Sequence, residues 1–211
     1  MSVWENILGK KDQAIGEVAG TEGGIIEIFV YPEHFSKIRV GSILIIDSEN
    51  QKPMGLVLKL AHSSRYGTFT PMKMTRTEIS NAYPDIERYH LFVSTIAYTS
   101  YLDDANIVRH GRAGPPKLHD LVYLIKSSDF DALLSFFRPN NKWDFTFLGY
   151  FFAEGATKWE FRDFLLLYRD FFKRFENEKD NILQTLIRAI SRAKPELLSA
   201  LLEEISEILG W

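Results

Sequence analysis

The sequence contains no cysteine. This excludes disulfides, thiol nucleophiles and cysteine-ligated zinc, and it is typical of a protein in a reducing compartment. The chain also lacks any run of about 18 apolar residues of the kind that spans a membrane, and its first six residues do not resemble a secretory leader. We therefore expect a cytoplasmic protein with no membrane partner.

An excess of charge of one sign is also missing. The 25 Lys and Arg nearly balance the 28 Asp and Glu, which leaves a net charge of -3. The whole molecule therefore has no attraction for nucleic acid, and any contact with it requires a local basic patch. The 211 residues suffice for one compact domain or two small ones without disulfides or metals.

The common catalytic motifs are absent as well. No G-x-x-x-x-G-K-[ST] is present to cradle a triphosphate, and no G-x-S-x-G marks a serine nucleophile. The spacing of the histidines does not indicate the converging ligands of a zinc site, since no two of them share a helix face. These histidines are His34, His62, His90, His110 and His119.

The acidic residues allow one hydrolytic function as an alternative, that of a metal-dependent nuclease. Asp103 and Asp104, with Asp85 and Glu87, could supply the paired acids of a metal-dependent nuclease, and Pro84-Asp85 resembles the first half of a nuclease motif. The second half, an acidic residue followed two positions on by lysine in a strand, is absent from the segments that follow. Asp85 is explained as the turn residue after Pro84. We expect no catalysis, no cofactor and no metal, and a hydrolase would require a pocket with convergent acids.

Short β-branched runs separated by Gly, Pro, Ser and Asn occupy residues 14–125 and predict about six strands. They cover residues 15–18, 25–30, 40–47, 53–60, 91–98 and 120–125. The first pair forms a hairpin around residues 20–24 and the second pair one around residues 48–51. Between them, the capping box Thr75-Arg76-Thr77-Glu78 begins a short helix that Pro84 ends. Short, evenly spaced strands favour a closed barrel, because closure removes their unpaired edges.

From residue 126 on, the apolar spacing is that of helices. Capping boxes at residues 128–131 and 157–160, and Asp180 as a further cap, predict three helix starts, and Pro195 predicts a fourth. The helical period of the phenylalanines in residues 130–175 indicates a core. The last helix carries a wide leucine stripe that fits either the preceding helix or another subunit. Its polar face holds Glu196, Glu203, Glu204 and Glu207.

Residues 12–125 resemble the HAS barrel, the small β-barrel that precedes the motor domain of HerA-type DNA translocases. The matching segments are Ile15-Gly16-Glu17-Val18, residues 39–46, Met54-Gly55-Leu56-Val57, and Pro115-Pro116 before Leu121-Val122-Tyr123. Gly41 allows a tight start of its strand, and the two prolines hold an extended approach to the last strand. The family usually has glycine near position 119, where this chain has His119.

The resemblance implies an assembly module. In HerA-type translocases a helical link and then a phosphate-binding loop follow the barrel. Here Phe147-Leu148-Gly149-Tyr150 resembles the start of that link, but no phosphate-binding loop follows. The family's barrel lies at the end of a ring and makes contacts between subunits and with partners. The implied role is therefore docking without catalysis.

The alternative function is nucleic-acid binding on a small barrel. Arg109-His110-Gly111-Arg112 with Lys117 forms a basic cluster in a Gly- and Pro-containing loop, and flexible arginines pair with phosphates. Tyr98 and Tyr101 lie nearby in sequence and could stack on bases. Asp103 and Asp104 would cancel part of the charge. Arg109 and Arg112 are the residues that we expect to make contacts, with either a protein partner or nucleic acid.

Together these observations predict an α+β protein in two parts: a small closed barrel of HAS-barrel type over residues 12–126 and an all-helical region over residues 127–211. We expect an assembly or adaptor module related to DNA translocation or repair. Its partner would be a translocase, a nuclease or a copy of itself. If the two parts are independent, a chain cut at Lys126 should leave a folded barrel.

Overall fold

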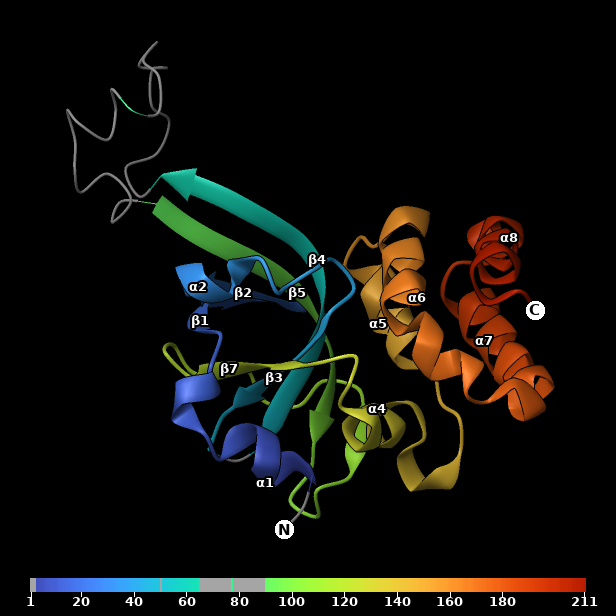
Figure 1. Cartoon of the computed structure of the whole chain (residues 1–211), viewed down its shortest axis with the longest axis horizontal. Coiled ribbons are helices and arrows are strands. Elements are labelled where there is room, and N and C mark those ends of the chain that lie inside the picture. Colours follow the sequence, from blue (N-terminus) through green and yellow to red (C-terminus); the bar gives the residue numbers. More distant parts are fainter. Residues whose placement is uncertain (1–2, 50, 65–76, 78–89) are drawn as a thin grey trace.

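The computed structural model describes residues 3–49, 51–64, 77 and 90–211 (Figure 1). The expected capping box at residues 75–78 and the short helix after it fall almost wholly on residues 65–76 and 78–89, outside the described residues. The carboxylates of Asp85 and Glu87 also lie outside them.

Six antiparallel strands form a closed barrel at one side of the molecule (Figure 1). Neighbouring strands pair in the order β2-β1-β7-β3-β4-β5, and pairing of β2 with β5 closes the ring. The strands are β1 (Gly16–Glu22), β2 (Ile25–Val30), β3 (Ile43–Asp47), β4 (Lys52–Ser64), β5 (His90–Leu102) and β7 (Leu121–Ile125). The predicted α+β class, the closed barrel and both expected hairpins are confirmed.

Two local predictions in the barrel are wrong. A seventh strand, β6 (Val108–His110), pairs with β5 outside the ring, where the sequence had indicated a basic loop. The first hairpin turn is also tighter than expected, because β1 continues through the glycine-containing segment to Glu22. The turn is made by Gly23 and Gly24 alone, and Gly23 takes a φ of +58°, which suits glycine.

The barrel wall is buried on both of its faces where it meets the helices. Inside the ring, residues such as Val18, Ile28, Leu44 and Val122 form one apolar cluster. Outward-facing neighbours belong to a second cluster, which the barrel shares with the helices. The alternation explains why Ile43 to Ile46 of β3 are all fully buried, since odd and even positions face different cores.

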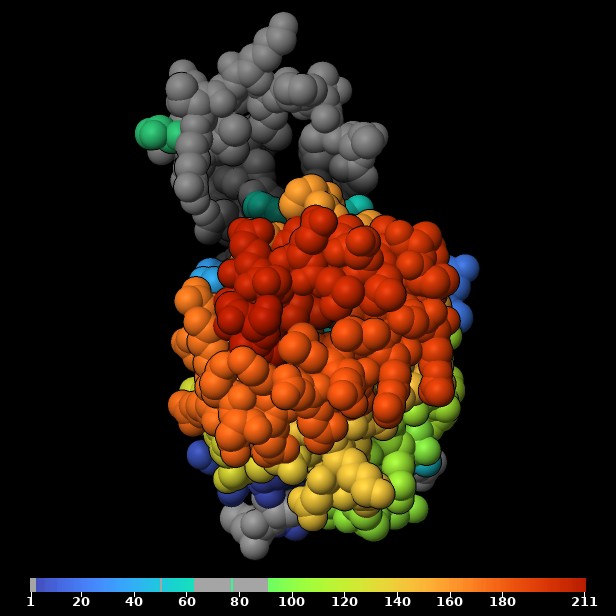
Figure 2. Space-filling model, turned by 90° about the vertical axis from the view of Figure 1, so that its right-hand side faces the viewer, coloured from blue at the N-terminus to red at the C-terminus, as the bar shows by residue number. Residues whose placement is uncertain are grey.

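The helices of the C-terminal region gather on one side of the barrel, with the C-terminus on their far side, whereas the two N-terminal helices lie against other parts of the barrel (Figure 1). Near the barrel wall are α1 (Val3–Leu8), α2 (Pro32–Phe35), α4 (Phe130–Phe137) and α5 (Phe147–Ala153), followed by α6 (Lys158–Lys173), α7 (Lys179–Ala193) and α8 (Leu198–Leu209). Viewed from that side, α7 and α8 form most of the surface that faces away from the barrel (Figure 2). Among the described residues, no helix is long and apolar enough to cross a membrane.

Of the three helix caps predicted from the sequence, one forms. Thr157 and Glu160 form the predicted capping box of α6. The box predicted at residues 128–131 does not form, because α4 begins one residue later than the box requires. Asp129 rather than Ser128 stands at the N-cap position, and its carboxylate accepts the amide of Lys126 instead of a helix amide. Asp180 is not a cap either, since α7 begins one residue before it. A cap requires its side chain to be free for the helix amides, which residue type alone does not ensure.

Aromatic rings fill the helical core, as their spacing predicted. Phe137 lies at its centre, with ring centroids of seven neighbours between 5.0 and 6.1 Å away, among them Phe164 of α6 and Phe172. The stripe of α8 is covered from within the chain, since α8 packs on α6 and α7 and Leu201 and Ile205 are buried. The intramolecular alternative for this stripe is the one that the structure adopts.

The helical layer contacts the barrel closely at one point. Gly41 takes a φ of +83°, and a Cβ atom there would lie 2.6 Å from the Cα atom of Phe164. Two residues on, the buried amide of Ile43 donates to the hydroxyl of Tyr168 at 2.9 Å. The change from strands to helices falls between Ile125 and Phe130, as expected, but the packing crosses it.

Candidate functional site

The predicted contact residues do not converge on one surface. Arg109 lies in β6, where its Nε atom donates to Asp103 at 2.9 Å. The same carboxylate accepts the amides of Ala105 and Ile107 and closes the β5–β6 turn. Burial alone would raise the pKa of Asp103, but the amide of Ile107, the guanidinium of Arg109 and the amide of Ala105 together lower it. Arg109 is thus engaged within its own hairpin.

Arg112 connects the barrel to the helical layer. Its Nε atom donates to the carbonyl of Tyr98 at 3.0 Å, and its guanidinium forms an ion pair with Glu154. The guanidinium also lies over the ring of Tyr150, 5.3 Å from its centroid, and against Gly24, where a Cβ atom would overlap it. This arginine therefore holds the β1–β2 turn, β5 and the end of α5 together.

The same replacement at these two arginines is expected to have different effects on stability. Arg112→Ala removes a charged hydrogen bond, an ion pair and a cation–π contact, and should lower the free energy of unfolding by about 2 kcal/mol. Arg109→Ala removes an exposed ion pair and should cost less than about 1 kcal/mol. Urea denaturation of the two variants measures the difference. Equal costs would show that Arg112 is not a structural contact.

The remaining predicted contact residues are also engaged in contacts within the protein. Tyr98 is only 3% exposed, and its hydroxyl accepts the amide of Ala113 at 2.8 Å, so its ring is not available to stack on a base. Tyr101 is half-buried against the barrel interior. Lys117 is exposed and pairs with Glu49 of the β3–β4 turn, which lowers the pKa of that carboxyl. Each of the three cations of the set therefore has a carboxylate partner.

A contact between the buried Ser100 and the half-buried His110 was not anticipated from the sequence. The Nδ1 atom of His110 lies 2.9 Å from Oγ of Ser100, and the ring packs between Phe136 and Phe147. Asp144 contributes a nearby negative charge. The combination resembles a nucleophile with its base, but Ser100 is 0% exposed and no substrate reaches its hydroxyl. We interpret the pair as structural.

The environment of His110 gives the protein an acid-sensitive stability. Burial lowers the pKa of His110 to about 4, against the opposing charge of Asp144. Among the described residues the Nε2 atom has no hydrogen-bond partner of normal geometry, although the backbone of Asp144 and Phe136 also opposes the lowering of the pKa. An unfolded chain takes up this proton near pH 6.5, so stability is complete above that pH and is lost as the pH falls toward 4.

Between pH 7 and pH 4.5 the loss through His110 should amount to roughly 2–3 kcal/mol. His110→Asn, which keeps an acceptor near Ser100, should remove that part of the pH dependence. Urea denaturation across this pH range tests it, with His34→Asn as the surface control. A wild-type slope that survives in His110→Asn would contradict the assignment.

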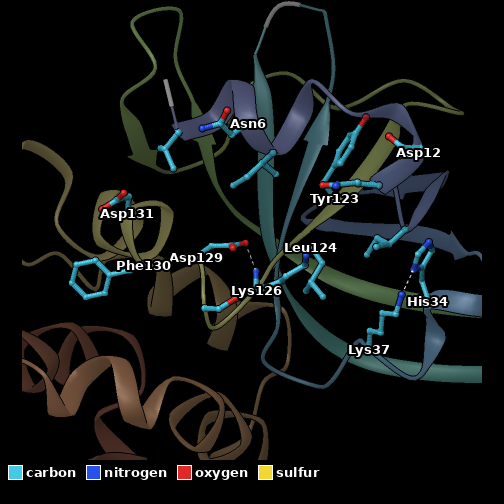
Figure 3. Close-up of a pocket in the computed structure, with 15 residues that line it drawn as sticks. Asn6, Asp12, His34, Lys37, Tyr123, Leu124, Lys126, Asp129, Phe130 and Asp131 are labelled. Atoms are coloured by element: carbon cyan, nitrogen blue, oxygen red, sulfur yellow. Dashed lines mark hydrogen bonds between the residues drawn. The ribbon is translucent and has the colours of Figure 1, made fainter. Parts of the chain in front are cut away.

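A cavity of about 540 Å³ lies under the N-terminal segment (Figure 3). Its lining mixes charges of both signs, with Lys37, Lys126 and His34 against Asp12, Asp129 and Asp131. The buried hydroxyl of Tyr123 has no hydrogen-bond partner among the described residues. Burial, with the charges of Asp47 and Asp12, raises its pKa. Figure 3 shows the carboxylates spread around the cavity, so they do not form a catalytic pair.

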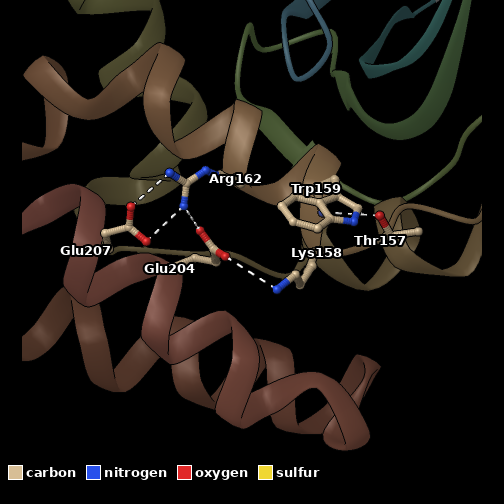
Figure 4. Close-up of polar contacts among 6 residues, drawn as sticks. All are labelled: Thr157, Lys158, Trp159, Arg162, Glu204 and Glu207. Atoms are coloured by element: carbon tan, nitrogen blue, oxygen red, sulfur yellow. Dashed lines mark hydrogen bonds and ion pairs between the residues drawn. The ribbon is translucent and has the colours of Figure 1, made fainter.

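An ion-pair network joins α6 to α8 (Figure 4). Glu204 is only 6% exposed and pairs with Arg162, which also donates to Glu207 at 2.9 and 3.1 Å. Glu204 therefore lies in the helix interface rather than on the expected polar face. Beside it, Lys158 stands over the ring of Trp159, 4.6 Å from the centroid. Trp159 is 61% exposed. The sequence feature that indicates this exposure is the position of Trp159 outside the apolar stripe of α6.

Within the described ranges, no three His, Asp or Glu side chains are grouped so that they could hold a metal ion. His110 and His34 are half-buried in different parts of the structure, and His119 is exposed. His119 takes a φ of +67°, a conformation that favours glycine.

Comparison of the sequence with models of protein families and with curated proteins finds no match.

Proposed function

We propose that the protein is a non-catalytic assembly or adaptor module of the HAS-barrel type that serves DNA-processing or repair machinery. The closed six-stranded antiparallel barrel is the architecture that this resemblance implies. Two backbone details support it: Gly41 has the positive φ expected for a tight strand start, and His119 has a positive φ where the family usually carries glycine. The partner in this proposal is a translocase or a nuclease.

The observation that carries an adaptor role is the exposed apolar pair on α6. Trp159 is 61% and Leu166 47% exposed, although the opposite side of the same helix is buried. Seven residues are about two helical turns, so the two side chains share one face. Exposed tryptophan is enriched among the residues that dominate protein–protein binding energy. An apolar face of this kind fits a protein partner better than a phosphate backbone.

The nucleic-acid alternative has less support from the geometry. The three cations that would bind phosphates are each paired with a carboxylate, and Tyr98 is buried. Binding would require these pairs to open. A steep fall of affinity with salt that is lost in Arg109→Ala plus Lys117→Ala would favour this alternative.

The test is affinity capture of the tagged full-length chain from its host lysate, with and without nuclease. We expect a nuclease-resistant protein partner whose yield falls at least about fivefold in Trp159→Ser. Leu118→Ser, at an equally exposed apolar residue away from α6, is the matched control and should leave the yield unchanged. Loss of all co-purifying material on nuclease treatment, or equal yields from all three proteins, would overturn the proposal.

A further inference from the structure

The β4 strand is paired unequally on its two sides. On the β5 side it pairs from Lys52 to Ser64. On the other side β3 covers only Met54 to Leu56, and Gly41 and Ser42 bond to Val57. From Leu58 on, no other described strand pairs with this side of β4. Alternate residues of an antiparallel strand turn their amide and carbonyl groups away from the paired neighbour, so this edge can accept a further strand.

A groove of about 700 Å³ lies between this part of β4 and α6. Its apolar lining includes Leu60 of β4 with Leu166 and Leu167 of α6, and Leu166 is 47% exposed. Figure 1 shows the ribbon of β4 and β5 running out beyond the rest of the barrel, so this edge is reached from the side. An extended segment laid along the edge would place alternate side chains on this apolar lining.

The charges around the groove favour an acidic occupant. Lys37 and Arg39 line it, and both are exposed. Among the described residues neither has a carboxylate partner, and the Lys37 ammonium lies 3.0 Å from Nδ1 of His34. Lys59, also exposed, lies on β4 beside Leu60. The lining includes one carboxylate, Asp163, so the cations are in excess. The basic residues of the Arg109 region, by contrast, are already neutralised.

The same charges oppose pairing with a second copy. Two identical edges meeting about a twofold axis bring the same patch of each subunit together. Lys37, Arg39 and Lys59 of one copy would then face their own counterparts. Lysine on an open edge is a common device against such self-pairing.

We propose that the edge of β4 from Leu58 onward binds an extended acidic segment of a partner protein, which adds to the sheet as a strand. Its apolar side chains pack on Leu60, Leu166 and Leu167, and its carboxylates pair with Lys37 and Arg39. This assignment rests on the proposed adaptor function and names the partner segment by its chemistry.

The probe is a phage-displayed library of random peptides of about ten residues, selected on the immobilised full-length chain. We expect enrichment of sequences in which Val, Ile or Leu alternates with Asp or Glu. A selected peptide should bind at least about tenfold more weakly to Lys37→Glu plus Arg39→Glu. Lys142→Glu plus Arg192→Glu reverses two exposed cations elsewhere and should bind within about twofold of the wild type. Amide exchange at residues 58–61 should slow in the complex, as strand pairing requires.

Several results would overturn the assignment. These are no enrichment, enrichment of basic peptides, unchanged binding to the groove variant, or a dimer in sedimentation equilibrium that the peptide dissociates. The adaptor function is tested separately by lysate capture with the same groove variant. A nuclease-resistant partner retained by that variant leaves the adaptor function standing and assigns the partner to another surface, whereas no partner for either protein removes both.

Discussion

A fragment that ends at Lys126 is expected to be unfolded or aggregated, although it contains every strand of the barrel. Five large apolar side chains on the barrel strands, Ile43, Ile45, Met54, Leu56 and Ile125, belong to the cluster shared with the helices. Each is at most 1% exposed in the whole chain. Exposing five such side chains costs about 10 kcal/mol, which is as large as the total stability of a typical domain. This expectation replaces that of an independent barrel.

Circular dichroism and urea denaturation of the fragment measure the effect. Addition of residues 127–211 as a second fragment should restore the native spectrum, because the two fragments supply each other's missing surface. A fragment 1–126 that unfolds cooperatively on its own, with a native near-ultraviolet spectrum, would contradict the shared core and return the molecule to two independent parts.

Gly41→Ala is expected to destabilise the protein by about 4 kcal/mol through two separate costs. A left-handed backbone disfavours alanine by roughly 1–2 kcal/mol. In addition, the new methyl group would meet the backbone of Phe164 at 2.6 Å, and overpacking of this kind typically costs about 1–3 kcal/mol or more. Relief requires α6 to move away from the barrel, which also strains the hydrogen bond between Ile43 and Tyr168. Thermal and urea denaturation measure the loss.

Gly23→Ala separates the cost of the left-handed backbone from the cost of overpacking. Gly23 also has a positive φ, of +58°, but a Cβ atom there would have no neighbour within 4 Å. Its replacement should therefore cost only about 1 kcal/mol. If the two variants lose the same stability, the close approach of α6 to Gly41 is not a source of strain.

Local periodicity predicted most of the fold. Short β-branched runs bounded by turn residues located the barrel strands, and the helical spacing of the phenylalanines located the helical core. The β6 strand was missed because Val108-Arg109-His110 is too short and too polar to form such a run. The caps predicted at Ser128 and Asp180 failed because each helix begins one residue away from the position that its cap requires: α4 one residue later and α7 one residue earlier.

The candidate site was less predictable because its charges are paired at long range. Arg112 is neutralised by Glu154, 42 positions away, and Lys117 by Glu49, 68 positions away. A sequence window shows only neighbouring charges, such as Asp103 beside Arg109. The exposure of Trp159 and of the edge of β4 also depends on tertiary packing. A local sequence pattern does not show which surfaces the folded chain leaves uncovered.

The bond between Ile43 and Tyr168 makes one backbone amide a reporter of how the two layers separate. The acceptor of this amide is a side chain of α6, whereas its neighbours in β3 bond within the sheet. Any opening that detaches α6 while the barrel remains intact would therefore release the Ile43 proton to solvent before those of β3. The hydrogen-exchange rate at this single position thus distinguishes hinged opening of the helical layer from collapse of the molecule as one cooperative unit.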